Sequence, residues 1–284
     1  MNTINKEYPI KVDVFTLCYN EMDIIPFVID YWKRFARHVY VFDNGSTDGS
    51  VEYLNEFGWI SVMPFYSDGL NDARYLDIKN NAWKISDADF VVVCDMDECL
   101  YHEDIMGVLQ YMKDNNQSIS PTAFLNTVSI DFHEKPADGT LYHEIDGVRI
   151  SNNVKLGDKC LLFNPRMISE ISYEPGAHIC HPAGNVLLYD RQNEDPIMTV
   201  HIKNLSLNKT LERLHMYRSR LSDINKINKW GGHYEYSDDK VKKDFIMNWQ
   251  TSVDYKQIYD HFHNHNEEEK EVTSAETEVS SGET

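Results

Sequence analysis

No stretch of this sequence is long and apolar enough to cross a membrane, and its first residues lack the pattern of a signal peptide. Cysteine is scarce: the chain has five, an odd number, at spacings that do not repeat. We therefore expect no disulfide framework and a reduced, cytoplasmic setting. We expect the protein not to be integral to a membrane, and peripheral attachment at the inner face of a membrane stays open.

Positive charge is also in short supply. The chain has 27 Lys and Arg against 46 Asp and Glu, a net charge of −19, which argues against general binding to nucleic acid or to anionic membranes. Residues 267–284 contain seven Glu and one Lys among small polar residues. Such a segment cannot bury enough apolar surface to fold, so we predict a disordered acidic tail over residues 265–284.

One segment reverses this acidic balance. Residues 201–243 contain ten Lys and Arg against five Asp and Glu. Part of this segment has helical spacing, which would place a set of cations largely on one side of a helix. The set comprises Lys209, Arg213, Arg218 and Arg220. It is a candidate surface for an anionic acceptor or a membrane, and the alternative is a solvated helix face.

Apolar strand patterns and helical patterns alternate over the first hundred residues. We predict strands over 12–17, 38–42, 59–65 and 90–95, with helices between them. The pattern is typical of an α/β fold with a mostly parallel central sheet flanked by helices. We divide the chain into a main domain over 1–235, with halves 10–100 and 101–235, a helical extension over 236–264 and the tail over 265–284.

Asp95 and Asp97 follow the apolar run at residues 90–94. The run is β-branched and aromatic, which predicts a strand buried on both faces. Because side chains two apart in a strand point the same way, we expect both carboxylates to project together from its end. They would repel each other without a cation between them, and hard oxygen ligands favour Mg²⁺, Mn²⁺ or Ca²⁺. The alternative is two solvated aspartates in a turn.

Four segments resemble the motifs of family 2 glycosyltransferases, in the same order and spacing. They are Cys-Tyr-Asn-Glu at 18–21, Asp-Asn-Gly-Ser-Thr-Asp-Gly at 43–49, Lys-Asn-Asn-Ala at 79–82 and the Asp-x-Asp-Glu strand at 89–98. The resemblance covers about residues 10–100 and implies the GT-A fold, which binds nucleotide-sugars. One departure is Lys79, where the family usually has Arg, so a point charge replaces a bidentate fork.

The resemblance also implies roles for individual residues. It places the nucleobase and ribose against the first two loops, with contacts from Tyr19, Asn20, Glu21, Asp43, Asn44 and Gly45. It places the sugar diphosphate near Lys79, Asn80, Asp95, Met96, His201 and Lys203. It implies an Mn²⁺ or Mg²⁺ ion held by Asp95, Asp97 and His178. The alternatives are local: Asp and Asn favour turns anyway, and a lone His is usually a satisfied polar side chain.

The catalytic base is the least determined of these roles. An inverting transferase needs a carboxylate to take the proton of the acceptor hydroxyl. The candidates are Asp131, Glu134, Glu174, Asp158 and Glu98. We rank Asp131 first, because it follows a strand expected beside the metal site. For Glu98 we expect instead a role in orienting the metal-binding strand.

These observations together predict a metal-dependent glycosyltransferase of the hexosyltransferase type. It would move a sugar from a nucleotide-sugar, with a UDP-sugar favoured, to a glycan or lipid-linked acceptor, with inversion. Its products would belong to polysaccharide biosynthesis. Two alternatives are a nucleotidyltransferase and a non-catalytic protein that binds nucleotide-sugars or carbohydrate on the same scaffold. No Gly-rich basic loop follows the first strand, which argues against the nucleotidyltransferase.

Overall fold

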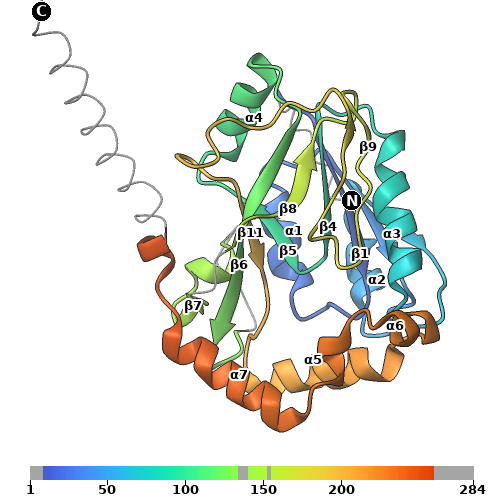
Figure 1. The fold of residues 1–284 in the computed structure, drawn as a ribbon, viewed down its shortest axis with the longest axis vertical. Coiled ribbons are helices and arrows are strands. Elements are labelled where there is room, and N and C mark those ends of the chain that lie inside the picture. The colour runs from blue at the N-terminus through green and yellow to red at the C-terminus, as the bar shows by residue number, and fades with distance from the viewer. Residues whose placement is uncertain (1–8, 134–139, 152–154, 259–284) are drawn as a thin grey trace, which may run out of the picture.

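The computed structural model describes residues 9–133, 140–151 and 155–258, without the side chains of residues 155–158 (Figure 1). Glu134 and the tail at 265–284 therefore lie outside the described residues, as does the side chain of Asp158. Within the described part of the chain, no helix is long and apolar enough to span a membrane.

The first half forms a parallel sheet with helices between its strands. The strands, in their order across the sheet, are β3 (Ile60–Pro64), β2 (His38–Asp43), β1 (Val12–Cys18) and β4 (Phe90–Asp95). The helices are α1 (Ile25–Trp32), α2 (Ser50–Leu54) and α3 (Asp72–Asn81), and a 3₁₀ turn, Ala82–Ile85, follows α3. Every residue of β1 is buried, as expected for a central strand covered on both faces. The predicted strand and helix alternation is confirmed.

The second half turns this parallel sheet into a mixed one. Its strands are β5 (Glu98–Tyr101), β6 (Ile119–Ser129), β7 (Val148–Ile150), β8 (Lys155–Phe163) and β11 (Met198–His201). Strand β8 lies between β4 and β6 and is antiparallel to both, whereas β11 is parallel to β6. The α/β class is confirmed, and the parallel order ends at β4 because no helical crossover leads into β8.

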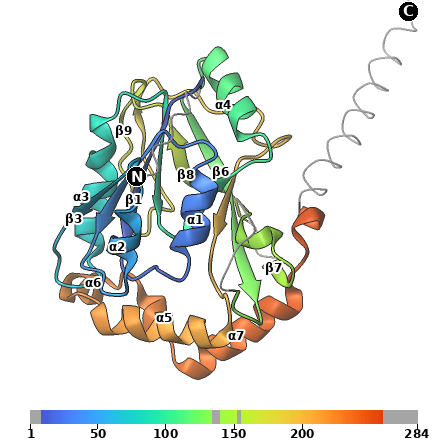
Figure 2. The same cartoon turned by 180° about the vertical axis from the view of Figure 1, so that it is seen from behind.

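The remaining elements complete the fold. They are α4 (Ile105–Asp114), the 3₁₀ turns Tyr142–Glu144 and Gly232–Glu235, the two-stranded sheet of β9 (Ile168–Glu170) and β10 (Ala183–Gly184), and the helices α5 (Leu207–Arg220), α6 (Asp223–Asn228) and α7 (Asp238–Thr251). Three serines, Ser206, Ser222 and Ser237, accept a backbone N–H and so cap the starts of these last helices. Helices α5, α6 and α7 lie across one end of the sheet (Figures 1 and 2).

Residues 206–228 form two helices, α5 and α6, with a short break between them. The chain leaves the helix at Leu221 and Ser222, where it bridges to Leu70 in the segment between β3 and α3. The amide of Leu70 donates to the carbonyl of Arg220 at 2.6 Å, and the amide of Ser222 donates to the carbonyl of Leu70 at 3.1 Å. This pairing attaches the end of α5 to the first half of the molecule.

Candidate active site

The carboxyl end of β4 places the first carboxylate and a turn places the second. Strand β4 ends at Asp95, and Met96 and Asp97 turn the chain into β5. The amide of Met96 donates to Leu17 in β1 at 3.1 Å, and the carbonyl of Asp97 accepts from Ile202 at 2.7 Å. Strand alternation therefore does not extend to Asp97, contrary to the sequence interpretation, because the strand ends two residues earlier. The side chain of Met96 is buried in the core.

Asp95 is paired with Lys79 of α3. The ammonium lies 2.8 Å from the carboxylate, and the Lys79 side chain is 8% exposed against 36% for Asp95. Burial alone would lower the pKa of Lys79, but the charges of Asp95 and Glu98 raise it to about 12. A permanent cation thus lies beneath a carboxylate that stays open to solvent.

Asp97 has two other neighbours, one arginine and one histidine. Its Oδ2 lies 2.8 Å from the Arg213 guanidinium and 3.3 Å from Nε2 of His201. Burial opposes ionisation of Asp97, but the charges of His201 and Arg213 hold the pKa of Asp97 well below its usual range. These contacts therefore favour the ionised form of Asp97.

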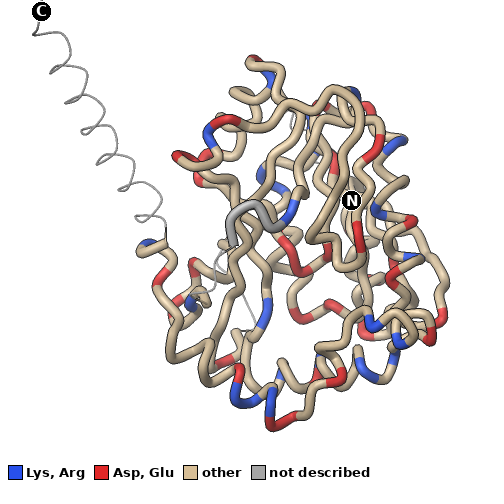
Figure 3. The backbone as a smooth tube through the Cα atoms, in the orientation of Figure 1, with Lys and Arg blue, Asp and Glu red and all other residues tan. Residues whose placement is uncertain are grey.

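Arg213 connects this site to the loop after β1. Its guanidinium also bonds Glu21, and the Tyr217 hydroxyl donates to the other Glu21 oxygen at 2.9 Å. Burial raises the pKa of Glu21 to about 7, although the charge of Arg213 opposes this shift. Glu21, Arg213 and Asp97 form one chain of alternating charge. Lys and Arg positions (blue) and Asp and Glu positions (red) are interspersed along the helices at this end of the sheet (Figure 3).

Glu98 lies behind the two aspartates. It forms an almost fully buried ion pair with Lys159 of β8, and its Oε2 accepts from the Asp95 amide at 3.3 Å. The side chain therefore supports the backbone at the end of β4 and does not face solvent. This position suits the orienting role expected for Glu98.

The two candidate histidines share one aromatic neighbour. The rings of His178 and His201 pack on Phe124 of β6, with centroids 5.4 Å and 5.2 Å from it. Nδ1 of His201 is 2.8 Å from Asn126 Oδ1, so its other nitrogen faces Asp97. The structure thus brings both histidines to the site, although its described residues contain no cluster of three or more His, Cys, Asp or Glu side chains that could hold a metal ion.

The loop after β2 is tied together by Asp43. Its carboxylate is buried and accepts from the amides of Gly45 and Ser46 at 2.9 Å and 3.0 Å and from the Ser46 hydroxyl. Gly45 has φ +83, a value that L side chains rarely adopt. Asp43 thus shapes the turn, which is the alternative reading of this motif.

Three asparagines of the motifs likewise accept hydrogen bonds from other parts of the protein. Asn20 (φ +53) accepts from the amide of Thr47 at 2.7 Å and so joins the first two loops. Asn80 accepts from the amide of Tyr173 at 2.7 Å. Asn44 accepts from Tyr75 at 3.1 Å and from Arg220, whose guanidinium stacks on Tyr19. The groups expected to face the nucleoside therefore lie at the carboxyl ends of β1 and β2, whereas Asn80 is near the end of α3.

The candidates for the catalytic base lie on separate segments of the chain. Asp131 is exposed on the loop after β6 and makes no side-chain bond within the described residues. Its neighbour Phe132 lies under the Lys209 ammonium, 5.1 Å away, so this loop reaches helix α5. Glu174 is exposed and pairs with His181 at 2.8 Å.

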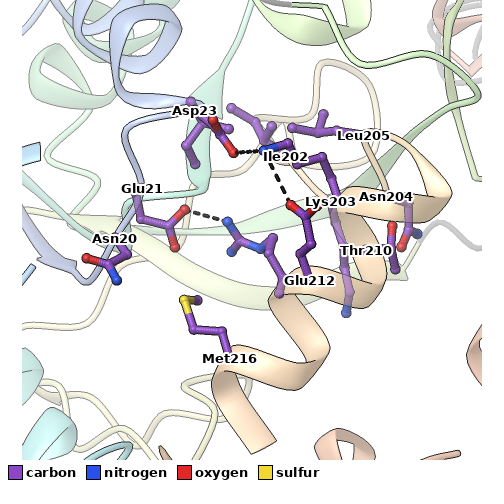
Figure 4. A pocket seen from close by; sticks show the side chains of 13 residues that line it. Asn20, Glu21, Asp23, Ile202, Lys203, Asn204, Leu205, Thr210, Glu212 and Met216 are labelled. Carbon is purple, nitrogen blue, oxygen red and sulfur yellow. Dashed lines mark hydrogen bonds and ion pairs between the residues drawn. The ribbon is translucent and has the colours of Figure 1, made fainter. Parts of the chain in front are cut away.

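A pocket of about 230 Å³ opens between the loop after β1 and helix α5 (Figure 4). Its polar lining includes Glu21, Lys203 and Arg213. Lys209 also lines it and pairs with Asp23 at 2.7 Å and with Glu212 at 3.4 Å. Lys203 forms no ion pair among the residues whose side chains are described. The pocket is therefore a polar space in which Lys203, as far as the described residues show, has no carboxylate partner.

The sequence interpretation missed the roles of helix α5. It treated the basic segment as one exposed face, but Arg213 and Arg220 point into the site, and Arg218 donates to the carbonyls of Tyr234 and Tyr236. The signal was present in the spacing, because Arg213, Tyr217 and Arg220 lie at i, i+4 and i+7 on one helix face. Reading them as an inward face required knowing what α5 packs against.

Comparison with models of protein families identifies the family of this chain. The model of the family described as "Glycosyl transferase family 2" matches residues 13–160, just over half of the chain. A comparison with curated proteins found no match. Among solved structures, the crystal structure of S. aureus TarS 1–349 matches at 12% identity and a TM-score of 0.40, covering 76% of this chain and 68% of that one. The match over residues 13–160 includes all four motif segments, and the chain therefore belongs to glycosyl transferase family 2 and is a glycosyltransferase.

Proposed function

We propose that this glycosyltransferase moves a sugar from a UDP-sugar to a glycan or lipid-linked acceptor, with inversion at the transferred sugar. The observation that supports this most is the pair Asp95 and Asp97, at the end of β4 and in the turn after it, which are surrounded by basic side chains from three different elements. Ligands of open α/β sheets bind at the carboxyl ends of strands. A nucleoside diphosphate bound there would leave as an anion, and preplaced positive charge stabilises such a leaving group.

The loops after β1 and β2 would hold the nucleoside. Tyr19 would offer a ring face and Asn44 an amide to the base, and we assign ribose binding to Asn20 and Glu21. Asp43 and Gly45 contribute by shaping the turn that carries Asn44. The sugar diphosphate would lie over Asp95, where Lys79, Asn80, His201 and Lys203 surround it.

The residues present fit a divalent cation, Mg²⁺ or Mn²⁺. Asp95 is partly open to solvent, and His178 is exposed beside His201, which itself contacts Asp97. Mg²⁺ commonly takes one or two carboxylates and completes its shell with water and phosphate oxygens, so a closed cage is not required. Asp95 and Asp97, with His178, would hold the ion. When bound, it neutralises charge on the departing diphosphate.

The acceptor would enter through the pocket beside Arg213. Asp131 remains our first candidate for the base, because its loop reaches Lys209 at the edge of this pocket. In that role its carboxylate takes the proton of the acceptor hydroxyl while the oxygen attacks the anomeric carbon and the nucleoside diphosphate leaves. Glu134 and Glu174 are the other candidates.

A binding screen tests the proposal first. Purified protein is heated with UDP-, GDP-, CMP- or dTDP-sugars, each with Mn²⁺, Mg²⁺ or EDTA, because a ligand that binds only the folded state raises the melting temperature. Stabilisation by one nucleotide class that is lost with EDTA supports a metal-bridged donor site. Absence of stabilisation by every sugar nucleotide would contradict the proposed donor site.

Turnover then tests the two carboxylates. Asp95→Asn and Asp97→Asn should each abolish release of nucleoside diphosphate from the donor found in the screen. Asp114→Asn, on α4 at the opposite end of the sheet, is a matched control that should leave turnover unchanged (Figure 1). Full activity of either site variant, or release of pyrophosphate instead of nucleoside diphosphate, would overturn the assignment.

A further inference from the structure

The side chain of Arg220 lies where the nucleobase is expected. Its guanidinium carbon is 3.1 Å from the centroid of the Tyr19 ring, and one of its nitrogens donates to Oδ1 of Asn44 at 2.5 Å. A guanidinium is flat and carries N–H donors in its plane, as a pyrimidine ring with an N–H group does. Arg220 therefore makes the two contacts, one stacking and one hydrogen-bonded, that a base would make with Tyr19 and Asn44.

The backbone of Arg220 is held firmly, so that only its side chain is free to change place. Its carbonyl accepts from Leu70, and the amide of Asp72 donates to Asn225 Oδ1 at 2.9 Å, which fixes the start of α6 as well. Gly69 has φ +82, and a Cβ there would lie 2.1 Å from the Arg220 carbonyl oxygen. The site for the base is thus closed by a side chain, and no helix has to move to open it.

The guanidinium is not fully satisfied in this position. Its Nη1 is buried and has no hydrogen-bond partner among the described residues. A buried donor without a partner carries a free-energy cost, which reduces the net stabilisation of the stacked arrangement. The contact is therefore one that a better-matched ligand can replace.

We propose that Arg220 is an internal competitor of the nucleobase, which a donor must displace from Tyr19 and Asn44 before it binds. The proposal rests on the proposed function, which places the base at these two residues. When only a fraction of the protein is in the form that can bind the ligand, the apparent affinity is the intrinsic affinity multiplied by that fraction. Arg220 would thus lower the affinity for every nucleotide that stacks on Tyr19 by the same factor.

Calorimetric titration of UDP with Mg²⁺ tests this directly. Arg220→Ala should bind UDP about tenfold more tightly than the unaltered protein, a change of the size expected when one close cation–π contact is removed. Arg220→Lys, which keeps the charge without the flat fork, should fall between the two. Methylguanidinium, added below denaturing concentrations, should weaken the binding of UDP to Arg220→Ala, so that its affinity approaches that of the unaltered protein.

A matched control is available at a remote stack. The Arg191 guanidinium lies 3.7 Å from the centroid of Tyr111, so Arg191→Ala removes an arginine–tyrosine contact far from the site and should not change UDP affinity. Thermal unfolding of each variant confirms that it is folded. Unchanged or weaker UDP binding by Arg220→Ala would overturn the inference alone. If neither protein binds UDP, GDP, CMP or dTDP with Mg²⁺, the proposed function fails as well.

Discussion

At the scale of single residues, charge pairing is the dominant feature of the site. Asp95, Asp97 and Glu98 lie within four positions of one another, and each is paired with cations from a different part of the chain. Three carboxylates this close in sequence would destabilise the fold if they were left unpaired. Lys79, Lys159 and Arg213 compensate them. In the proposed function, Lys79 and Arg213 would also help to stabilise an anionic leaving group.

The buried Glu98–Lys159 pair allows a test by a double-mutant cycle. Lys159→Met leaves a buried carboxylate without its partner and should lower the free energy of unfolding by about 3–5 kcal/mol. Adding Glu98→Gln should recover part of that loss, because the uncompensated charge is then gone. Urea unfolding of the two single variants and the double variant measures the coupling. Simple additivity of the two single effects would show that the pair is not coupled.

Arg213 has a comparable role nearer the surface. Arg213→Met leaves Glu21 and Asp97 without their shared cation, so we expect a lower melting temperature and loss of donor turnover. Lys242→Met is the control, because Lys242 makes only an exposed pair with Asp239 at 3.9 Å. Exposed pairs contribute about 0–1 kcal/mol, so this variant should unfold like the unaltered protein. Equal melting temperatures for the two variants would contradict the linking role of Arg213.

At the scale of secondary-structure elements, the break between α5 and α6 determines how the second half covers the first. The bridge from Leu221 to Leu70 holds α5 across the ends of β1 and β2, with Arg213 and Arg220 directed at the loops of those strands. A continuous helix over 206–228 would have carried the chain past the site without this attachment. The short break thus places two site residues at once.

Gly69 is the position at which that attachment can be tested. Gly69→Ala forces an alanine to a positive φ and directs its Cβ at the Arg220 carbonyl oxygen, 2.1 Å away. We expect the Leu70–Leu221 bridge to separate, with faster hydrogen exchange at the amides of Leu70 and Ser222 and a loss of about 1–3 kcal/mol in stability. Gly232→Ala is the control, since a Cβ there meets nothing within 4 Å and Gly232 has no positive φ. Unchanged exchange at both amides would refute this account of the attachment.

At the scale of the whole molecule, global stability should depend on pH through a buried histidine. His143 packs against Tyr101 and Tyr255, with ring centroids 4.6 Å and 4.3 Å away, and its ring nitrogens have no partner among the described residues. Burial lowers the pKa of His143 from 6.5 to about 3. The unfolded chain therefore binds a proton near pH 6.5 that the folded protein does not bind until about pH 3.

The sign of the effect follows from that difference. As pH falls from about 6.5, His143 contributes a loss of stability of up to about 1.4 kcal/mol per pH unit. His143→Phe removes the titrating group and keeps an aromatic ring. The difference in the free energy of unfolding between this variant and the unaltered protein should therefore change with pH below about 6.5 and be constant above it. Urea unfolding between pH 4 and pH 8 measures both curves. A difference in unfolding free energy that does not vary with pH would rule out the contribution of His143.

The alternation of strands and helices, the position of the β4 carboxylates and the family motifs were readable from local sequence. Each depends on residues within about ten positions of one another, where periodicity and turn chemistry are decisive. The motif at 43–49 illustrates the limit of such reading. Its sequence identified a turn between β2 and α2, and the structure shows how Asp43 holds that turn by bonding Gly45 and Ser46.

Side-chain partners and strand direction could not be read in this way. Asp97 meets Arg213, and Tyr19 meets Arg220, across separations that only packing of α5 against the sheet brings together. The antiparallel position of β8 between β4 and β6 likewise depends on long-range pairing. Local patterns specify which residues form elements and which carry chemistry, because backbone preference acts over a few residues. The partners of those residues were set by tertiary packing, because Coulomb and stacking interactions act through space and do not depend on separation along the chain.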